Sequence, residues 1–336
     1  MSSPAINSVP KDSATVILVR QDHGKTLEVF LARRHVNQSF MAGVFVFPGG
    51  QLEATDADFF LTKLISVKED FQPQSLLQDN SLTKKMALSF FVCAIRETFE
   101  ETGVLFARSS SGHSIDFGNA IIKSRFAAYR RSLNLGNITL AEIARQEELI
   151  LMPASLLPYS HWITPEIIPK RFSTRFFLAE LPQGQSAITD SDELTSSLWV
   201  TPHDALQMYT AGKITLMPPT LKTLEEMATF ISLDDLFAAA GSRRVYPIMP
   251  QPMKDGLKLP HDPEYSIERY KQPVRSGESS TYSAGRGKMA MHSISQITTG
   301  IIRPANFKRT LFLKHGSHYP PLRGIIQLTD ITSLRL

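Results

Sequence analysis

The sequence predicts an α/β protein, and three observations lead to that prediction. Short β-branched or alternating apolar runs predict strands, namely a hairpin over 13–31 and single strands at 44–47, 104–107, 173–181 and 197–200. Segments with helical periodicity lie between or after these runs, at 82–102, 117–152, 202–211 and 220–240. The composition, with 42% hydrophobic and 20% charged residues, is that of a globular chain and excludes wholesale disorder and fibrous repeats.

The segment 82–102 is the most regular of the predicted helices. Its apolar residues form one stripe at helical spacing: Leu88, Val92, Ile95 and Phe99. Gly103 stands where a glycine commonly ends a helix, because glycine adopts a left-handed backbone without steric cost. The pattern therefore predicts a helix with one buried face and a defined end.

The 336 residues are enough for one large domain or two small ones. The regular pattern occupies residues 10–240, which we expect to form one domain. From Gly241 onward proline and glycine are frequent, so residues 241–336 are expected to form an irregular, partly flexible extension. This extension holds 15 Lys/Arg against six Asp/Glu, whereas the whole chain has a net charge of +4. Such a surface suits nucleic acid, anionic lipid or a polyphosphate ligand, or is simply a solvated basic face.

Several features of the sequence bear on the cellular location of the protein. The single cysteine excludes an intramolecular disulfide framework and a zinc site built from several cysteines. The sequence begins without the pattern of a secretory signal, and no apolar run approaches the roughly 18 residues of a membrane span. We therefore expect a cytoplasmic protein without a membrane span. The final Leu334–Leu336 resembles the peroxisomal S-K-L address only weakly, because leucine replaces the small residue.

The acidic residues at the end of the predicted helix 82–102 are the candidates for a functional site. At 100° per residue, Glu97, Glu100 and Glu101 fall within one arc of about 100°. Carboxylates this close repel one another, and a hard divalent cation with oxygen ligands would remove that repulsion. Arg96 is four residues before Glu100 and can pair with it. The alternative is a solvated acidic face with an intrahelical salt bridge.

A second acidic segment follows the predicted strand 44–47. Pro48 and the Gly49–Gly50 pair are expected to stop that strand in a turn that lets the backbone approach a ligand closely. Glu53 and Asp56 then place two more carboxylates just after the turn. The order of strand, glycine pair, acids and acidic helix favours a metal site over a plain acidic face.

These segments resemble the Nudix box: Gly, five residues, Glu, seven residues, then Arg-Glu-aliphatic-x-Glu-Glu-x-Gly-aliphatic. Gly50 matches the leading glycine, Asp56 stands in place of the first glutamate, and Arg96 to Val104 match the second half, with Thr98 where an aliphatic residue is usual. The spacing departs from the family, because the 39 residues from Ala57 to Ile95 replace seven.

An insertion at this point is a feature of the acyl-coenzyme A diphosphatase-like branch of the family. The chain is similar to that branch in further segments: 30–34, 41–50, 161–165, 171–177, 198–202 and 217–220. The resemblance implies an α/β/α sandwich with a mixed sheet, a helical insertion at about 57–87, and the basic C-terminal extension. It also implies hydrolysis of the diphosphate of CoA or acyl-CoA, with Mg²⁺ or Mn²⁺, to 3′,5′-ADP and (acyl-)4′-phosphopantetheine.

Site residues follow by position from the same resemblance. The metal ligands would be Glu97, Glu100, Glu101 and the Gly50 carbonyl, with Glu97 alternatively the water-activating base and Arg96 orienting a glutamate. Glu193, in a loop between two predicted strands, is a candidate general base, and an exposed acidic loop is the alternative. Further residues are expected to contact the substrate, the arginines through its phosphates: Arg33, Arg34, Arg171, Arg175, Gly49, Gly50 and Glu53. The basic extension would help to hold the 3′-phosphate.

Other functions stay open at this point. The box binds only the diphosphate and the metal, so ADP-ribose or NADH would serve as well as CoA. A non-catalytic Nudix module that binds a nucleotide or a partner protein is disfavoured by the complete set of Arg96, Glu97, Glu100 and Glu101. An RNA-processing enzyme would need a continuous basic groove with stacking aromatics, which the sequence lacks, so no nucleic acid is expected. The oligomeric state is open.

Overall fold

The computed structural model describes residues 8–22, 26–35, 41–58, 71–189, 194–253 and 256–272. Within these residues a mixed sheet of eight strands follows the order β10-β7-β8-β1-β2-β3, with β4 pairing to β1 and β9 to β2. Its strands are β1 (Lys11–Gln21), β2 (Leu27–Arg34), β3 (Phe45–Val46), β4 (Gly49–Gln51), β7 (Leu157–Ile163), β8 (Phe172–Glu180), β9 (Leu194–Val200) and β10 (Pro247–Ile248). The β1–β8 and β10–β7 pairs are parallel and the others antiparallel, so the sheet is mixed as expected.

The long strand β1 organises the sheet. Its first half pairs with β4, its second half pairs with β2, and β8 runs along its opposite edge. Successive residues of β1 alternate between two cores. Ala14, Val16 and Leu18 join the core beneath the long helix α3 (Lys84–Thr102), whereas Ile17 and Val19 join the core of the other face.

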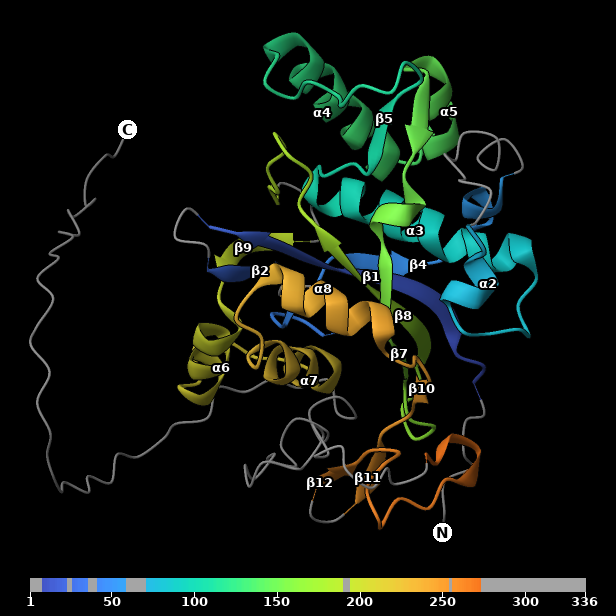
Figure 1. The fold of residues 1–336 in the computed structure, drawn as a ribbon, viewed down its shortest axis with the longest axis vertical. Coiled ribbons are helices and arrows are strands. Elements are labelled where there is room, and N and C mark those ends of the chain that lie inside the picture. The colour runs from blue at the N-terminus through green and yellow to red at the C-terminus, as the bar shows by residue number, and fades with distance from the viewer. Residues whose placement is uncertain are drawn as a thin grey trace, which may run out of the picture. The chain divides into compact units, whose positions relative to one another are not determined.

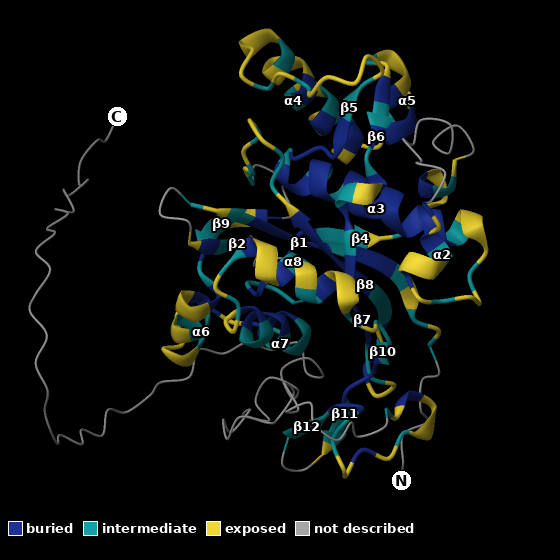
Figure 2. Cartoon of the chain, viewed as in Figure 1, coloured by how far each residue is buried: buried dark blue, intermediate teal, exposed yellow. Residues whose placement is uncertain are grey.

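Helices cover both faces of the sheet, which confirms the sandwich (Figure 1). Helix α3 lies on one face, and α7 (Pro218–Met227) and α8 (Leu233–Ser242) lie on the other, with α6 (Pro202–Thr210) beside α7. Colouring by burial shows that the sheet and the inner side of α3 are buried (Figure 2). The acidic residues of α3 therefore stand on a well-packed element.

Helix α3 agrees closely with its prediction. The Thr83 hydroxyl accepts a hydrogen bond from the amide of Met86 and caps the start. Gly103 ends the helix with φ 75°, in the left-handed conformation that glycine tolerates best. All four residues of the predicted stripe are buried in the core.

Two of the predicted helices were wrong in extent. Residues 220–240 form α7 and α8 instead of one helix, because Ser232 caps a new start at the amide of Asp235. Residues 117–152 form α4 (Ala120–Asn134), α5 (Leu140–Gln146) and the strand β6 (Leu149–Leu151). This strand pairs with β5 (Ala107–Ser109), which begins where the predicted strand 104–107 ends. Tertiary pairing overrides local periodicity here.

The insertion is described in part. The 3₁₀ turn η1 (Ala54–Ala57) leads into it, and it contains the short helix α2 (Pro73–Leu76), while residues 59–70 lie outside the described part. Gln78 bonds the backbone of Arg243 and Val245, just after α8. Asp79 forms an ion pair of 2.5 Å with Arg175 of β8. These contacts fasten the second half of the insertion to the sheet and to the chain after α8.

The chain after residue 240 contributes to the fold. Strand β10 pairs with β7 and extends the main sheet past the predicted boundary, and a small hairpin follows from β11 (Gln251–Met253) and β12 (Gly256–Lys258). The 3₁₀ turns η2 (Pro153–Ser155) and η3 (Glu268–Tyr270) complete the described elements. Residues 273–336, with most of the basic extension and Leu334–Leu336, lie outside the described part. None of the helices in the described ranges is long and apolar enough to cross a membrane.

The buried His161 of β7 predicts an acid-sensitive fold. Its Nε2 lies 2.9 Å from the Ser173 hydroxyl, and burial, followed by the nearby Arg175, lowers its pKa to about 3. Between that value and about 6.5 the unfolded chain binds a proton that the folded chain does not. The free energy of unfolding should therefore fall on acidification by about 1.4 kcal/mol per pH unit from this residue alone.

Urea unfolding of the wild type and His161→Gln between pH 6.5 and 4 measures this effect. The variant keeps a hydrogen-bonding side chain without a titrating group, so its stability should depend less steeply on pH. Equal slopes for the two proteins would contradict the prediction.

Candidate active site

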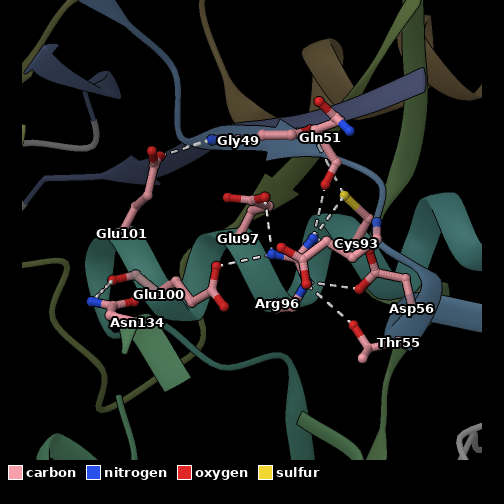
Figure 3. A network of polar contacts seen from close by, with 12 residues as sticks. Gly49, Gln51, Thr55, Asp56, Cys93, Arg96, Glu97, Glu100, Glu101 and Asn134 are labelled. Carbon is pink, nitrogen blue, oxygen red and sulfur yellow. Dashed lines mark hydrogen bonds and ion pairs between the residues drawn. The ribbon is translucent and has the colours of Figure 1, made fainter. Parts of the chain in front are cut away.

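A buried arginine on α3 organises the site (Figure 3). Arg96 makes a bidentate ion pair with Asp56, with Nε to Oδ1 at 2.7 Å and Nη2 to Oδ2 at 2.9 Å. Asp56 belongs to η1, just after β4, so this pair ties the helix to the loop that precedes the insertion. Paired, planar recognition of this kind suits arginine and not lysine.

The remaining Arg96 donors reach three further oxygens. Nη1 donates to Glu97 Oε1 at 3.0 Å and to Glu100 Oε2 at 2.9 Å, and Nη2 also donates to the Gln51 carbonyl at 3.0 Å. All five N–H groups of the guanidinium are thus directed at oxygen atoms. Arg96 thus holds the carboxylates of Glu97, Glu100 and Asp56 through hydrogen bonds.

The glycine pair lets α3 approach the strand β4. A Cβ on Gly50 would lie 2.2 Å from Glu97 Oε1, and one on Gly49, at φ 155°, would lie 2.3 Å from the Ala14 carbonyl oxygen. The Gly49 amide donates to Glu101 Oε2 at 2.8 Å. The predicted strand 44–47 does stop before Pro48, since β3 ends at Val46, but the expected glycine turn is wrong, because the two glycines form the separate strand β4 and pair with β1.

The C-terminal end of α3 has a support that the sequence did not reveal. Arg130 of α4 is buried and donates from Nε to the Glu100 carbonyl and from Nη2 to the Glu101 carbonyl, both at 2.8 Å. A cation at this end also interacts favourably with the helix dipole. No motif in the sequence signals this residue, because only the packing of α4 on α3 brings it there.

Negative charge exceeds positive charge around Arg96. Three carboxylates, those of Asp56, Glu97 and Glu100, share one guanidinium. Burial raises the pKa of Glu97 to about 8 and that of Glu100 to about 7. Arg96 opposes both shifts, while Glu100 adds to the shift at Glu97 and Glu53 adds to that at Glu100. A further cation near these carboxylates would stabilise their charged forms.

A cavity of about 1090 Å³ opens beside these acids. Several predicted site residues line it: Arg34, Gly49, Gly50, Glu53, Asp56, Arg96, Glu97, Glu100 and Glu101. The sequence analysis missed two further walls, residues 131–140 around the α4–α5 connection, and residues 250–253 and 256–257 around the β11–β12 hairpin. The mixture of carboxylates at one end and apolar side chains elsewhere is typical of a site for an organic ligand.

Arg34 is the predicted phosphate-binding arginine that reaches the cavity. It lines the cavity, and its Nε is buried with no hydrogen-bond partner in the described part of the chain. Arg33, its neighbour on β2, is exposed and donates to the Gly43 carbonyl at 3.3 Å. The β2–β9 register shifts between these two residues, and the structure places Arg34, not Arg33, at the cavity.

The other two predicted arginines lie outside the cavity lining. Arg171 is buried and donates to the carbonyls of Thr164 and Ser8, and Arg175 is buried against Asp79 and over the Phe90 ring. Both guanidinium groups serve the packing of β8 and neighbouring segments, so the structure does not support phosphate contacts for them. Glu193 lies outside the described residues.

The model of one protein family matches most of the domain just described. The NUDT19 Nudix domain matches residues 10–227. The chain belongs to this Nudix family. The acyl-coenzyme A diphosphatase NUDT19 of Xenopus laevis is 27% identical over 295 residues, covering 78% of this chain and 76% of the relative. The human protein of the same name is 28% identical over 236 residues, covering 62% of each chain.

The solved structures agree on the fold. A Nudix hydrolase from Alicyclobacillus acidocaldarius is 24% identical, with a TM-score of 0.56, and the match covers 70% of this chain and 97% of that one. Together with the family model and the named relatives, this makes the chain a Nudix hydrolase. The predicted family, fold and enzyme class are therefore confirmed.

Nudix hydrolases generally require a divalent metal, and the donor set of this site fits one. Arg96 takes one oxygen each from Glu97 and Glu100, so the second oxygen of each carboxylate is not used in those ion pairs. Crowded carboxylate oxygens are the ligands that hard divalent cations prefer. Within the described ranges, no three acidic, histidine or cysteine side chains already converge as a metal cluster.

Removing Arg96 should destabilise the fold strongly. In Arg96→Met the buried Asp56 loses its bidentate partner, and an uncompensated buried charge costs about 3–5 kcal/mol. Urea unfolding at neutral pH measures the loss. As a control, Arg125→Met removes a partly exposed ion pair with Glu147 and should cost less than about 1 kcal/mol. Similar losses for both variants would show that Arg96 is not the central tie.

Proposed function

We propose that the chain hydrolyses the diphosphate bond of CoA or acyl-CoA in a reaction that depends on Mg²⁺ or Mn²⁺. Water adds across the phosphoanhydride, so the P–O–P link breaks and the products are 3′,5′-ADP and (acyl-)4′-phosphopantetheine. The observation that carries the proposal is the Arg96 cluster at one end of a cavity large enough for such a substrate, in a chain related to acyl-coenzyme A diphosphatases.

The roles of the acids follow from their positions. Glu97, Glu100, Glu101 and the Gly50 carbonyl would hold the metal, which when bound neutralises charge on the phosphoryl oxygens and activates water. Arg96 fixes the carboxylates of Glu97 and Glu100 through the ion pairs described above. Glu101 anchors the Gly49 amide and so keeps β4 against α3. Arg34 would contact the substrate phosphates from the β2 side of the cavity.

Product analysis tests the reaction and the acids together. Wild-type protein incubated with CoA and Mg²⁺ should release 3′,5′-ADP, and EDTA should abolish the release. Glu100→Gln keeps the shape of the side chain but loses the charge, so kcat should fall at least about 100-fold. Glu225→Gln, which alters a glutamate outside the cavity lining that is paired with Lys222, is the matched control and should retain activity.

The outcomes separate the substrate from the enzyme class. Cleavage of ADP-ribose or NADH without cleavage of CoA would overturn the CoA assignment while leaving the diphosphatase chemistry intact. Metal binding without hydrolysis of any of the three would overturn the catalytic proposal.

The glycine beside Glu97 gives a second test. In Gly50→Ala the new methyl carbon would lie 2.2 Å from Glu97 Oε1 unless the carboxylate moves, so hydrolysis of CoA should fall at least about tenfold. Gly241→Ala is the control, because a Cβ there meets nothing within 4 Å. Full activity in Gly50→Ala would show that the position of Glu97 does not matter for the reaction.

A further inference from the structure

One row of residues across the sheet forms a floor of the cavity. Gln51 of β4 pairs with Ser13 of β1, Ser13 with Thr174 of β8, and Thr174 with Trp162 of β7. All four line the cavity. Neighbouring strands lie about 4.8 Å apart, so the row is about 14 Å long. The floor therefore runs from the strand beside Glu97 to Trp162, across the strands seen side by side in Figure 1.

The polarity of the cavity changes along this row. The β4 end carries the carboxylates of α3. In the middle, the Ser13 and Thr174 hydroxyls lie 2.7 Å apart and offer uncharged hydrogen-bonding groups. At the β7 end the lining turns apolar, with Trp162, Ile163 and Ile168. With the divalent cation that the carboxylates would hold under the proposed function, a matching ligand is anionic at the β4 end, neutral and polar in the middle, and apolar at the other end.

The apolar end is completed by exposed side chains. Ile167, in the β7–β8 connection, is 58% exposed, and Met253, in β11, is 38% exposed, yet both line this cavity. The β11–β12 hairpin lies beyond residues 10–227, the range matched by the family model. It is held in place by Gln251, which bonds the Ser266 hydroxyl and amide. The apolar end is therefore built partly by a segment outside the shared domain.

We propose that this part of the cavity, lined by Ser13, Thr174, Trp162, Ile167, Met253 and Leu257 and here named the arm subsite, binds the pantetheine arm of CoA with its acyl group beyond Trp162. This inference rests on the proposed function. The arm is an amide-linked chain, and about four residue-sized units at about 3.5 Å each match the 14 Å of the row. The amides face hydroxyls, and the acyl chain reaches the apolar end.

Trp162 stands at the point where the arm would end and the acyl chain begin. Its side chain is buried, and its indole Nε1 has no hydrogen-bond partner in the described part of the chain. Leaving a buried donor unsatisfied is unfavourable. A carbonyl of the bound arm or thioester would satisfy it. The competing occupant is the nucleoside, whose base would pack on the same indole.

Kinetics with substrates of different tail length test the arm subsite. The values of kcat/KM for octanoyl-CoA, free CoA and ADP-ribose are compared in wild type, Met253→Glu, Ile167→Glu and the control Ile231→Glu. Ile231 is 89% exposed and lies outside the cavity lining. A carboxylate at position 253 or 167 should lower the octanoyl-CoA value at least about tenfold relative to free CoA. The control should leave that ratio unchanged.

The kinetic outcomes are distinct. Equal losses on octanoyl-CoA and free CoA, or a loss on ADP-ribose instead, would overturn the arm subsite, the latter by placing the nucleoside there. If the wild type cleaves neither CoA compound, the proposed function fails and the arm subsite fails with it.

Binding without turnover gives a second readout. The chain has two tryptophans, so Trp199→Phe leaves Trp162 as the only one. In EDTA, its fluorescence should respond to octanoyl-CoA at a lower concentration than to free CoA, and not to ADP-ribose. Adding Met253→Glu should remove the advantage of octanoyl-CoA. An equal response to ADP-ribose, or none to octanoyl-CoA, would overturn the proposal.

Discussion

The buried guanidinium of Arg96 is the interaction on which the site depends. It connects three places in the chain that share no local structure: the backbone of β4 at Gln51, the 3₁₀ turn at Asp56, and the acids of its own helix. A buried ion pair contributes little net stability compared with apolar packing, but losing one partner is costly. The residue therefore sets the positions of the carboxylates more than it adds to the total stability.

The insertion does not disturb this arrangement. Asp56 and Arg96 are 40 positions apart, yet they meet in a bidentate pair. The entropy of closing a loop grows only slowly with its length, so added chain between two fixed points is tolerated. Gln78 and Asp79 then anchor the returning chain to neighbouring elements before α3 begins. The longer spacing therefore still brings the two halves of the motif together.

Different parts of the chain build the two ends of the cavity. The charged end is built by α3 and β4, inside the range shared with the family, whereas the β11–β12 hairpin at the apolar end lies beyond it. If the proposed arm subsite holds, reaction and recognition are carried by different segments. Substitutions at the hairpin would then alter which tail is accepted without touching the acids.

Short-range sequence patterns were enough to predict the helix α3, the first hairpin and the family. Three short-range patterns predicted α3: its apolar stripe, its C-cap at Gly103, and the order of Arg96, Glu97, Glu100 and Glu101. Patterns of this length can be recognised from sequence because they do not depend on tertiary contacts. The choice among the four arginines was decided only by the tertiary structure. Arg34 reaches the cavity, whereas Arg175 of β8 is buried against Asp79 and Arg171, just before β8, bonds the carbonyls of Thr164 and Ser8. Likewise Gly50 proved to be a strand residue whose missing side chain makes room for Glu97, a constraint that exists only once α3 packs against the sheet.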